Sequence, residues 1–139
     1  MSKNDSCIFC RIARNEIASY KVYEDDCVLA FLDVNPASRG HTLVVPKEHF
    51  DDITVCPKDI LDHVMHVVQT IAQAQIKELG ASGVNVISNV GEDAGQTVKH
   101  FHVHVIPRYA KDGLKLEFPA KRLEAGEMKL LADSIKQGI

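Results

Sequence analysis

The chain has 139 residues, of which 45% are hydrophobic and 25% are charged, and its formal net charge is −3. This composition is typical of one globular domain that is large enough to bury a core, and it lacks the basic excess that long nucleic acid attracts. No apolar run is long enough to span a membrane, and the polar start MSKNDS has no signal-peptide character. We therefore expect a cytoplasmic protein.

The first half of the chain predicts one short helix and three strands. CIFCRIARN, residues 7–15, is typical of a short helix, and YKVYE, residues 20–24, is typical of a strand. Two further apolar runs predict strands over residues 27–33 and 41–46. Pro46 closes the last of these, because proline cannot donate to a sheet ladder.

The second half of the chain predicts one long helix, two strands and a helical tail. Apolar residues recur at helical spacing over about residues 58–79, and Gly80 supplies a stop signal. Strands are expected over residues 84–90 and 98–106, and a further helix after Pro119.

This order of elements predicts an α+β fold. The expected architecture is a five-stranded, mainly antiparallel sheet with one long helix, a short N-terminal helix and a C-terminal helical tail. We treat residues 1–139 as a single domain.

The sequence HFHVHVIP places His100, His102 and His104 at alternate positions. Because side chains alternate between the faces of a strand, the three imidazoles share one face, and the intervening apolar residues can enter the core. The first and last imidazoles would be roughly 13 Å apart at their Cα atoms, too far for one metal ion to bind both. The three histidines therefore cannot all serve one metal ion, and they need at least two different roles.

Three interpretations of this row are open from the residues alone. It is a half-solvated strand with histidine at its polar positions, a metal site made from two neighbours, or a set of imidazoles facing a phosphate. We favour the phosphate interpretation, because neutral imidazole is a nucleophile and a general base near pH 7, and imidazolium stabilises phosphoryl charge.

Cys7 and Cys10 have the two-residue gap that is typical of zinc sites, and a redox pair is the rival interpretation. Redox pairs usually follow a strand of a βαβ unit, and no strand is expected before Cys7. Disulfides are not expected in a reducing compartment. The pair therefore favours metal binding.

Together, these motifs resemble the histidine triad family of nucleotide hydrolases and transferases. The segments that carry the resemblance are CIFCRI, AFLDVNPASRGHTLVVPKEH and AGQTVKHFHVHVIPR. The family pattern His-φ-His-φ-His-φ-φ, where φ is apolar, is satisfied from His100 to Ile106. The resemblance covers residues 7–107, the expected core, and leaves residues 108–139 as a tail. It is greatest to small phosphoramidase-like members, especially bacterial members with an N-terminal CxxC.

The resemblance implies three catalytic residues. His102 would attack the α-phosphorus of a nucleotide and form a covalent nucleotidyl-histidine, which water then hydrolyses. His104 would contact the phosphate and help in proton transfer. His41 would support the nucleophile through a hydrogen-bond relay, although by itself it is more simply a solvated strand start.

The resemblance also implies a nucleotide site. Asp33 would accept hydrogen bonds from the ribose hydroxyls, since an ionised carboxylate only accepts. The loop over residues 91–97 would approach the phosphate or the leaving group, and three apolar residues would form a slot for the base, although each of them could equally be core. The implied nucleotide-binding residues are Asp33, Asn89, Gly95, Gln96, Thr97, Phe9, Phe31 and Val34.

The resemblance supplies the missing ligands for a structural zinc ion. The implied set is Cys7, Cys10, His49 and His100, a closed Cys2His2 arrangement that suits a structural ion. A catalytic metal is the weaker alternative, and it predicts that zinc loss abolishes chemistry while the fold survives.

The expected activity is hydrolysis of purine nucleotides that are joined through the α-phosphate to an amine or another leaving group, with release of the nucleoside monophosphate. The alternatives are dinucleoside polyphosphate hydrolysis and a nucleotide-binding or adaptor protein with incidental hydrolysis. Because the family pairs subunits through the long helix and a sheet edge, we also expect a homodimer. The tail after Arg108 departs from the shortest phosphoramidase-like members, so the resemblance does not identify the leaving group.

Overall fold

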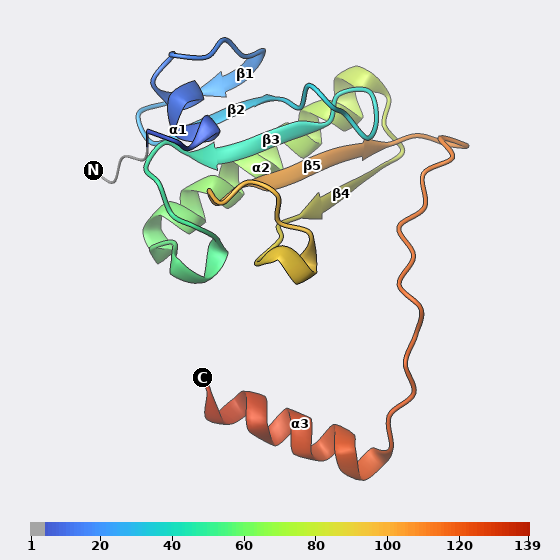
Figure 1. Ribbon diagram of the computed structural model, residues 1–139. Helices are drawn as coiled ribbons and strands as arrows, with labels where there is room; N and C mark the ends of the chain where they lie inside the picture. Colours follow the sequence, from blue (N-terminus) through green and yellow to red (C-terminus); the bar gives the residue numbers. More distant parts are fainter. Residues whose placement is uncertain (1–4) are drawn as a thin grey trace.

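The computed structural model, which describes residues 5–139, contains one five-stranded sheet in the order β1-β2-β3-β5-β4 (Figure 1). Every pair of neighbouring strands is antiparallel. The edges of the sheet are therefore β1 and β4. The strands are β1 (Lys21–Glu24), β2 (Val28–Leu32), β3 (Thr42–Pro46), β4 (Gly83–Ile87) and β5 (Val103–Arg108).

Helices cover both faces of this sheet (Figure 1). The expected α+β fold is confirmed, and the long helix has the predicted bounds. Its stop is Gly80, which takes a left-handed conformation with φ of 70°. In the described part of the chain, no helix is both long and apolar enough to cross a membrane. The helices are α1 (Ile8–Ala13), α2 (Lys58–Leu79) and α3 (Ala125–Gln137), with 3₁₀ turns η1 (Ile53–Val55) and η2 (Glu92–Ala94).

The core has two halves, one on each face of the sheet. In β2, Val28 and Ala30 point to the α2 side, whereas Leu29 and Phe31 point to the α1 side. All four residues are buried, because both faces of this strand are covered. The continuous apolar run CVLAF is the sequence signature of such a strand.

The strand that carries the histidines is shorter at its start than the sequence predicted. The expected strand over residues 98–106 begins only at Val103, so His100 and His102 precede it. The physical reason is a change of partner: the Phe101 N–H donates to the carbonyl of Phe50, in the loop after β3, at 2.6 Å. The alternation of faces nevertheless holds, since the three apolar residues of the motif enter the α2-side core.

The fourth strand also ends earlier than predicted. It was expected over residues 84–90 and ends at Ile87, whose cross-strand partner is His104. Beyond that pair, the Ser88 hydroxyl donates to the carbonyl of His102 at 2.7 Å. A side-chain hydrogen bond therefore replaces the ladder beside the histidine motif.

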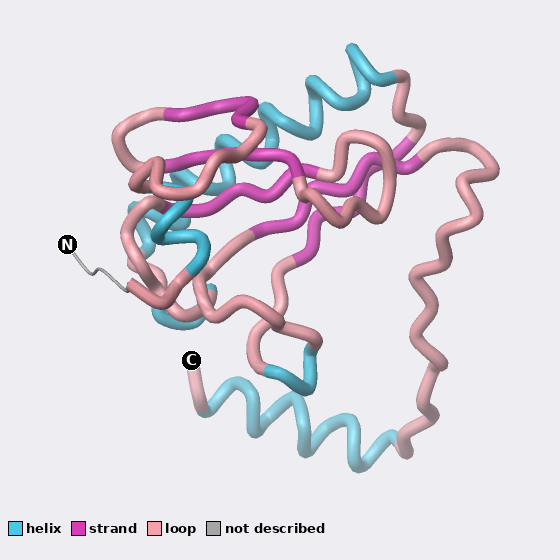
Figure 2. Tube along the Cα trace, turned by 45° about the horizontal axis from the view of Figure 1, so that its top comes forward, coloured by secondary structure: helices cyan, strands magenta, loops and turns pink. Residues whose placement is uncertain are grey.

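The tail helix forms as expected but lies away from the sheet. An extended arm, residues 114–124, carries α3 beyond the β4 edge (Figures 1 and 2). Every residue of α3 is exposed or half-exposed. The tail therefore adds nothing to the core that positions the site.

A polar clip connects the β1–β2 turn to α2. One carboxylate oxygen of Asp25 lies 2.6 Å from His63 Nε2 and accepts from the Tyr23 hydroxyl at 2.6 Å. The other oxygen accepts from the amides of Cys27 and Val28 at 2.8 Å. Burial alone raises the pKa of Asp25, but these hydrogen bonds outweigh it and hold the pKa well below its usual range.

This clip predicts an acid-sensitive contribution to stability. Because the folded pKa of Asp25 is depressed, its contribution is present above the unfolded pKa of about 4 and is lost as the pH falls below that value. We expect Asp25→Asn to lower the free energy of unfolding by about 1–3 kcal/mol at pH 7 and by less at pH 3. Urea unfolding at both pH values measures this. Asp26→Asn in the same turn is the control, and equal losses in both variants would contradict the prediction.

Candidate functional site

A pocket of about 380 Å³ lies on the α1 side of the sheet. His102 and His104 line it, together with Asp33 and Thr97. The rest of the wall is largely apolar and includes Ile8, Phe9, Ile12, Phe31, Val34 and Leu43. A pocket with a mostly apolar wall and a few convergent polar groups is typical of a small-molecule site.

His102 is held in one tautomer by a backbone carbonyl. Its Nδ1 lies 2.7 Å from the carbonyl oxygen of His100, which can only accept, so Nδ1 carries the hydrogen and Nε2 keeps its lone pair. Burial lowers the pKa of His102, against the opposing effects of that hydrogen bond and of Asp33. The ring is therefore neutral at pH 7, and its free nitrogen is a nucleophile.

A hydrogen-bonded pair of histidines lies beside it. The Ala37 amide donates to Nδ1 of His41 at 3.0 Å, so the hydrogen of the neutral ring is on Nε2. That Nε2 is 3.0 Å from Nδ1 of His104 and 3.6 Å from a carboxylate oxygen of Asp33. His41 therefore donates to His104, whose own hydrogen is then on Nε2.

Burial keeps this pair neutral. It lowers the pKa of His41, against the opposing charge of Asp33, and it lowers the pKa of His104 to about 4 with help from the two neighbouring imidazoles. The rings of His102 and His104 have centroids 4.9 Å apart. The sequence predicted that His41 would support the nucleophile, and in the structure its direct partner is His104.

The predicted base slot and ribose contact are in the pocket wall. Phe9 and Phe31 pack edge to face with centroids 5.6 Å apart, and both line the pocket while belonging to the core. Their contact with a base stays a prediction. Val34 lines the pocket and is 74% exposed. One oxygen of Asp33 accepts from the Asn35 amide at 2.8 Å, and the other faces His41.

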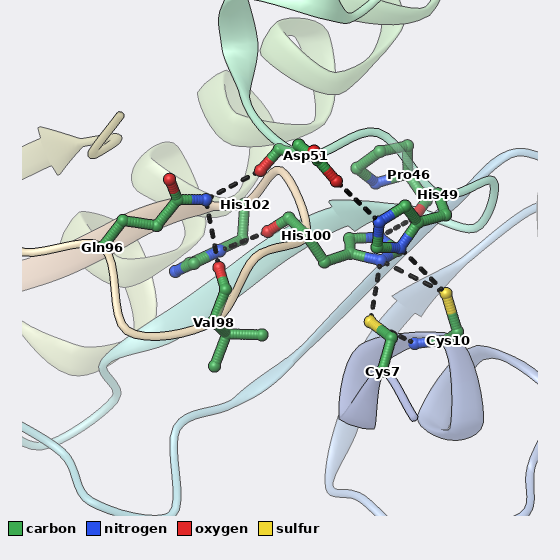
Figure 3. Close-up of polar contacts among 9 residues, drawn as sticks. All are labelled: Cys7, Cys10, Pro46, His49, Asp51, Gln96, Val98, His100 and His102. Carbon is green, nitrogen blue, oxygen red and sulfur yellow. Dashed lines mark hydrogen bonds and ion pairs between the residues drawn. The ribbon is translucent and has the colours of Figure 1, made fainter. Parts of the chain in front are cut away.

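The glycine-bearing loop is held by Gln96. Its Nε2 donates to the carbonyls of Asp51 and Val98 at 2.7 and 3.1 Å (Figure 3), and the Gly91 amide donates to its Oε1 at 2.8 Å. Of the predicted loop residues, Thr97 lines the pocket. Three others are not among the described lining residues: Asn89, Gly95 and Gln96. In this conformation the Gln96 amide is occupied by backbone partners.

A second cluster next to His102 brings together two cysteines and two histidines (Figure 3). Nδ1 of His100 is 3.3 Å from Sγ of Cys7 and 3.5 Å from Sγ of Cys10. Nδ1 of His49 is 3.3 Å from Sγ of Cys10. The N–S edge of a tetrahedral zinc site is roughly 3.6 Å, given Zn–N and Zn–S bonds of about 2.05 and 2.3 Å. The four donors therefore fit such an ion.

The outer nitrogens of the two cluster histidines already have partners. Nε2 of His100 lies 2.8 Å from the Pro46 carbonyl, and Nε2 of His49 lies 3.0 Å from a carboxylate oxygen of Asp51. These contacts direct both Nδ1 lone pairs toward the sulfurs, as second-sphere partners do in metal sites. Burial lowers the pKa of His100 to about 4, which keeps its ring neutral.

Two positioning residues were missed by sequence reasoning. Ser88 binds the carbonyl of His102, and Asp51 contacts His49 through its side chain and Gln96 through its carbonyl. Neither residue lies in a periodic pattern or a ligand spacing. The contact of Ser88 with His102 and that of Asp51 with Gln96 join residues far apart in the sequence, so only the folded chain shows them.

The HIT domain family matches residues 14–111. An uncharacterized HIT-like protein of Borreliella burgdorferi is 44% identical over 137 residues, which are 96% of this chain and 98% of that protein. Adenosine 5'-monophosphoramidase hnt1 of Schizosaccharomyces pombe is 35% identical over 135 residues, again 96% and 98% of the two chains. Adenylylsulfatase HINT3 of Arabidopsis thaliana is 40% identical over 112 residues, which are 81% of this chain and 56% of that protein.

Solved structures are similar over nearly the whole chain. A HIT family protein from Bacillus anthracis has a TM-score of 0.90 at 42% identity, over 97% of this chain and 98% of that one. SMU.412c from Streptococcus mutans has a TM-score of 0.93 at 39% identity, over 99% and 87%. A Zn-bound histidine triad family protein from Mycobacterium smegmatis has a TM-score of 0.76 at 37% identity, over 96% and 98%. Because the family match covers residues 14–111 and these relatives agree with it along its length, the chain belongs to the HIT domain family.

Proposed function

We propose that this protein hydrolyses purine nucleoside phosphoramidates, or related nucleotide conjugates, at the α-phosphate and releases the nucleoside monophosphate. The observation that carries the proposal is the pair of tautomers in the pocket: His102 offers a lone pair, and His104 beside it holds a hydrogen on Nε2. The relatives named as an adenosine 5'-monophosphoramidase and an adenylylsulfatase support a hydrolase that acts on nucleotides.

The first step forms a bond between Nε2 of His102 and the α-phosphorus while the bond to the leaving group breaks. The leaving amine takes the Nε2 hydrogen of His104, while His41 shares its own Nε2 hydrogen with Nδ1 of His104 across the 3.0 Å contact. The pair of histidines then carries one negative charge, which balances the positive charge on His102 until the second step returns the proton. Positive charge that develops on His102 is stabilised by the His100 carbonyl, which accepts its Nδ1 hydrogen.

The second step reverses the proton flow. His104 takes a proton from a water molecule as that water attacks the phosphorus, and the bond to His102 breaks to free the nucleoside monophosphate. Splitting one displacement in this way gives two lower barriers. Neutral rings suit both steps, because each histidine starts with one lone pair and one hydrogen.

The nucleotide would lie along the pocket wall. The ribose hydroxyls donate to Asp33, and the base packs against Phe9, Phe31 and Val34, which line the pocket. Thr97 contacts the phosphate side. The Gln96 amide would hold the loop in place over the phosphate by donating to the carbonyls of Asp51 and Val98. The residues that would shape this loop are Asn89, Gly95 and Gln96.

A structural zinc ion would be held by Cys7, Cys10, His49 and His100. Such an ion joins α1 to the segment before β5 and supplies no reactive group. Its benefit to the reaction is indirect, because the carbonyl that orients His102 belongs to His100. None of the four cysteines forms a disulfide within residues 5–139, which suits a reducing cytoplasm.

The protein would act as a homodimer that pairs through α2 and β4. Met65, Ala72, Ile76 and Leu79 follow one another at intervals of seven, four and three residues, which places them in one stripe of α2. Three of them are large and exposed: Met65 at 39%, Ile76 at 53% and Leu79 at 41%. The edge strand β4 adds Val86, which is 48% exposed, and its unpaired backbone groups.

We expect His102→Ala to lower turnover of adenosine phosphoramidate by a factor on the order of 10³ or more, because the nucleophile is lost. Rapid-quench mass spectrometry of the wild type should show a nucleotidyl adduct on the peptide that contains residue 102. His66→Ala on the exposed side of α2 is the control and should keep full turnover. Unchanged turnover in His102→Ala, with no adduct in the wild type, would refute the mechanism.

Metal analysis of the purified protein should find about one zinc ion per chain. We expect Cys10→Ser to lose most of this zinc and several degrees of melting temperature, whereas Cys27→Ser, at an exposed cysteine outside the cluster, should keep both. Hydrogen exchange should show α1 and residues 98–102 loosening on chelation. If chelation abolished turnover and left this protection unchanged, the ion would be catalytic instead.

Comparing substrates tests the leaving-group class. We expect kcat/KM for adenosine phosphoramidate to exceed that for a diadenosine polyphosphate by at least about tenfold, because His104 holds one hydrogen for a small amine. Faster cleavage of the diadenosine polyphosphate would favour the dinucleoside hydrolase. Tight AMP binding with no turnover of either compound would favour a binding protein.

A further inference from the structure

A buried glutamine of α2 reaches both chain segments that carry the His41–His104 pair. Gln75 is 4% exposed, and its helix covers the face of the sheet opposite the pocket (Figure 1). Its Nε2 lies 3.0 Å from the carbonyl oxygen of Gly40, which directly precedes His41. The same Nε2 lies 3.0 Å from the carbonyl oxygen of Val105, which directly follows His104. One side chain thus contacts the backbone beside both histidines.

The partners of Gln75 fix the orientation of its amide. A carbonyl oxygen can only accept, so the atom that faces both carbonyls is the NH₂ nitrogen. Both of its hydrogens are then used, one for each carbonyl. The remaining atom of the amide, Oε1, is buried and has no hydrogen-bond partner within residues 5–139. A buried polar atom without a partner costs stability, so packing alone does not account for a glutamine at this position.

The Gln75 amide joins two segments at the point where their strand ladder ends. The pairing of β3 with β5 begins at Thr42 and Val105. His41 precedes that first pair, so the ladder does not include it. Through the carbonyl of Gly40, the amide connects the segment before the ladder to β5. It therefore helps to set how far His41 lies from the strand that carries its partner.

Gly40 is also held close to α2 by its own conformation. Its φ of 93° lies in the left-handed region, which suits glycine. A Cβ at this position would overlap with Cδ1 of Leu79, one helical turn after Gln75, unless that side chain moved. The Thr42 hydroxyl donates to the same Gly40 carbonyl at 2.8 Å. The residue before His41 is therefore held from α2 and from β3.

The contact that these backbone positions set is the one that the proposed reaction uses. Nε2 of His41 lies 3.0 Å from Nδ1 of His104. As His104 gives its Nε2 hydrogen to the leaving group, negative charge develops on its ring, and the His41 N–H stabilises that charge. Two polar atoms about 3.6 Å apart no longer form a hydrogen bond. A backbone shift of about 0.6 Å would therefore remove this stabilisation.

We propose that Gln75 is a positioning residue, which holds His41 and His104 at hydrogen-bond distance from the far side of the sheet and so aids protonation of the leaving group. Gln75 is not among the described residues that line the pocket, so it acts only through the two histidines. This role rests on the proposed function, in which the leaving amine takes the Nε2 hydrogen of His104.

The kinetic test compares two leaving groups in Gln75→Met. Methionine keeps the length and helix propensity of the side chain but has no donor. The amine of adenosine phosphoramidate needs a proton to leave, whereas the phenolate of the p-nitrophenyl ester of AMP departs without one. We expect the single-turnover rate constant of the first step to fall by about tenfold or more for the phosphoramidate and by less than about twofold for the ester.

Two further variants sharpen this comparison. Gln73→Met, the same substitution at an exposed position of α2, is the matched control and should keep both rate constants. Gln75→Asn keeps an amide that is one methylene too short to bridge both carbonyls, and it should show the same selective loss if Gln75→Met does not fold. Equal losses for the two substrates would show that Gln75 only supports the fold and would overturn the proposal.

The second test observes the histidine contact without turnover. Two-dimensional ¹H–¹⁵N spectra of the imidazole rings report which nitrogen carries the hydrogen. In the wild type we expect one tautomer of His41, with a slowly exchanging hydrogen on Nε2. Gln75→Met should speed exchange of that hydrogen by about tenfold, and Gln73→Met should not. An unchanged His41 signal in Gln75→Met would also overturn the proposal.

The outcomes separate the role of Gln75 from the proposed function. A wild type that turns over neither substrate refutes the proposed hydrolase and, with it, the part of Gln75 in leaving-group protonation. A wild type that turns over both substrates, with equal losses or an unchanged ring signal in Gln75→Met, refutes the role of Gln75 and leaves the hydrolase intact.

Discussion

One hydrogen bond, from Nδ1 of His102 to the carbonyl of His100, connects the pocket with the cluster of cysteines and histidines. It spans 2.7 Å and fixes which nitrogen of His102 keeps its lone pair. The same His100 directs its side chain into the cysteine cluster, within 3.3 Å of Cys7 Sγ. A single residue thus places its ring in the cluster of two cysteines and two histidines and offers its backbone carbonyl to His102.

Burial of so many imidazoles is tolerated because each buried ring has a hydrogen-bond partner on at least one of its nitrogens. The Pro46 carbonyl, the Ala37 amide and the Asp51 carboxylate each contact the ring of a different histidine. Satisfied hydrogen bonds offset the cost of removing polar groups from water. Burial in turn lowers the pKa values of His41, His100, His102 and His104, so the rings stay neutral. The contacts that make the site stable therefore also set its proton positions.

Local periodicity was sufficient for most of the fold. The helical spacing over residues 58–79 predicted α2 to the residue, because its apolar face and the glycine stop are both local signals. The prediction was wrong where a distant partner intervened. Residues 98–102 have strand-like alternation, yet Phe101 pairs with Phe50 in another loop. The partners of Gln96 also include one from a distant loop, the Asp51 carbonyl, which no motif signals. Its predicted contact with the phosphate stays a prediction.

The sequence by itself determined which residues are candidates for the chemistry and which faces they occupy, since residue type and alternation are properties of a short segment. Only the tertiary structure decided which nitrogen of each histidine bears the hydrogen, that His41 binds His104, and that two cysteines meet two histidines some 40 and 90 residues away. It also decided that α3 stands apart from its own sheet. These outcomes depend on contacts between segments far apart in the chain, and their geometry exists only once the sheet has brought those segments together.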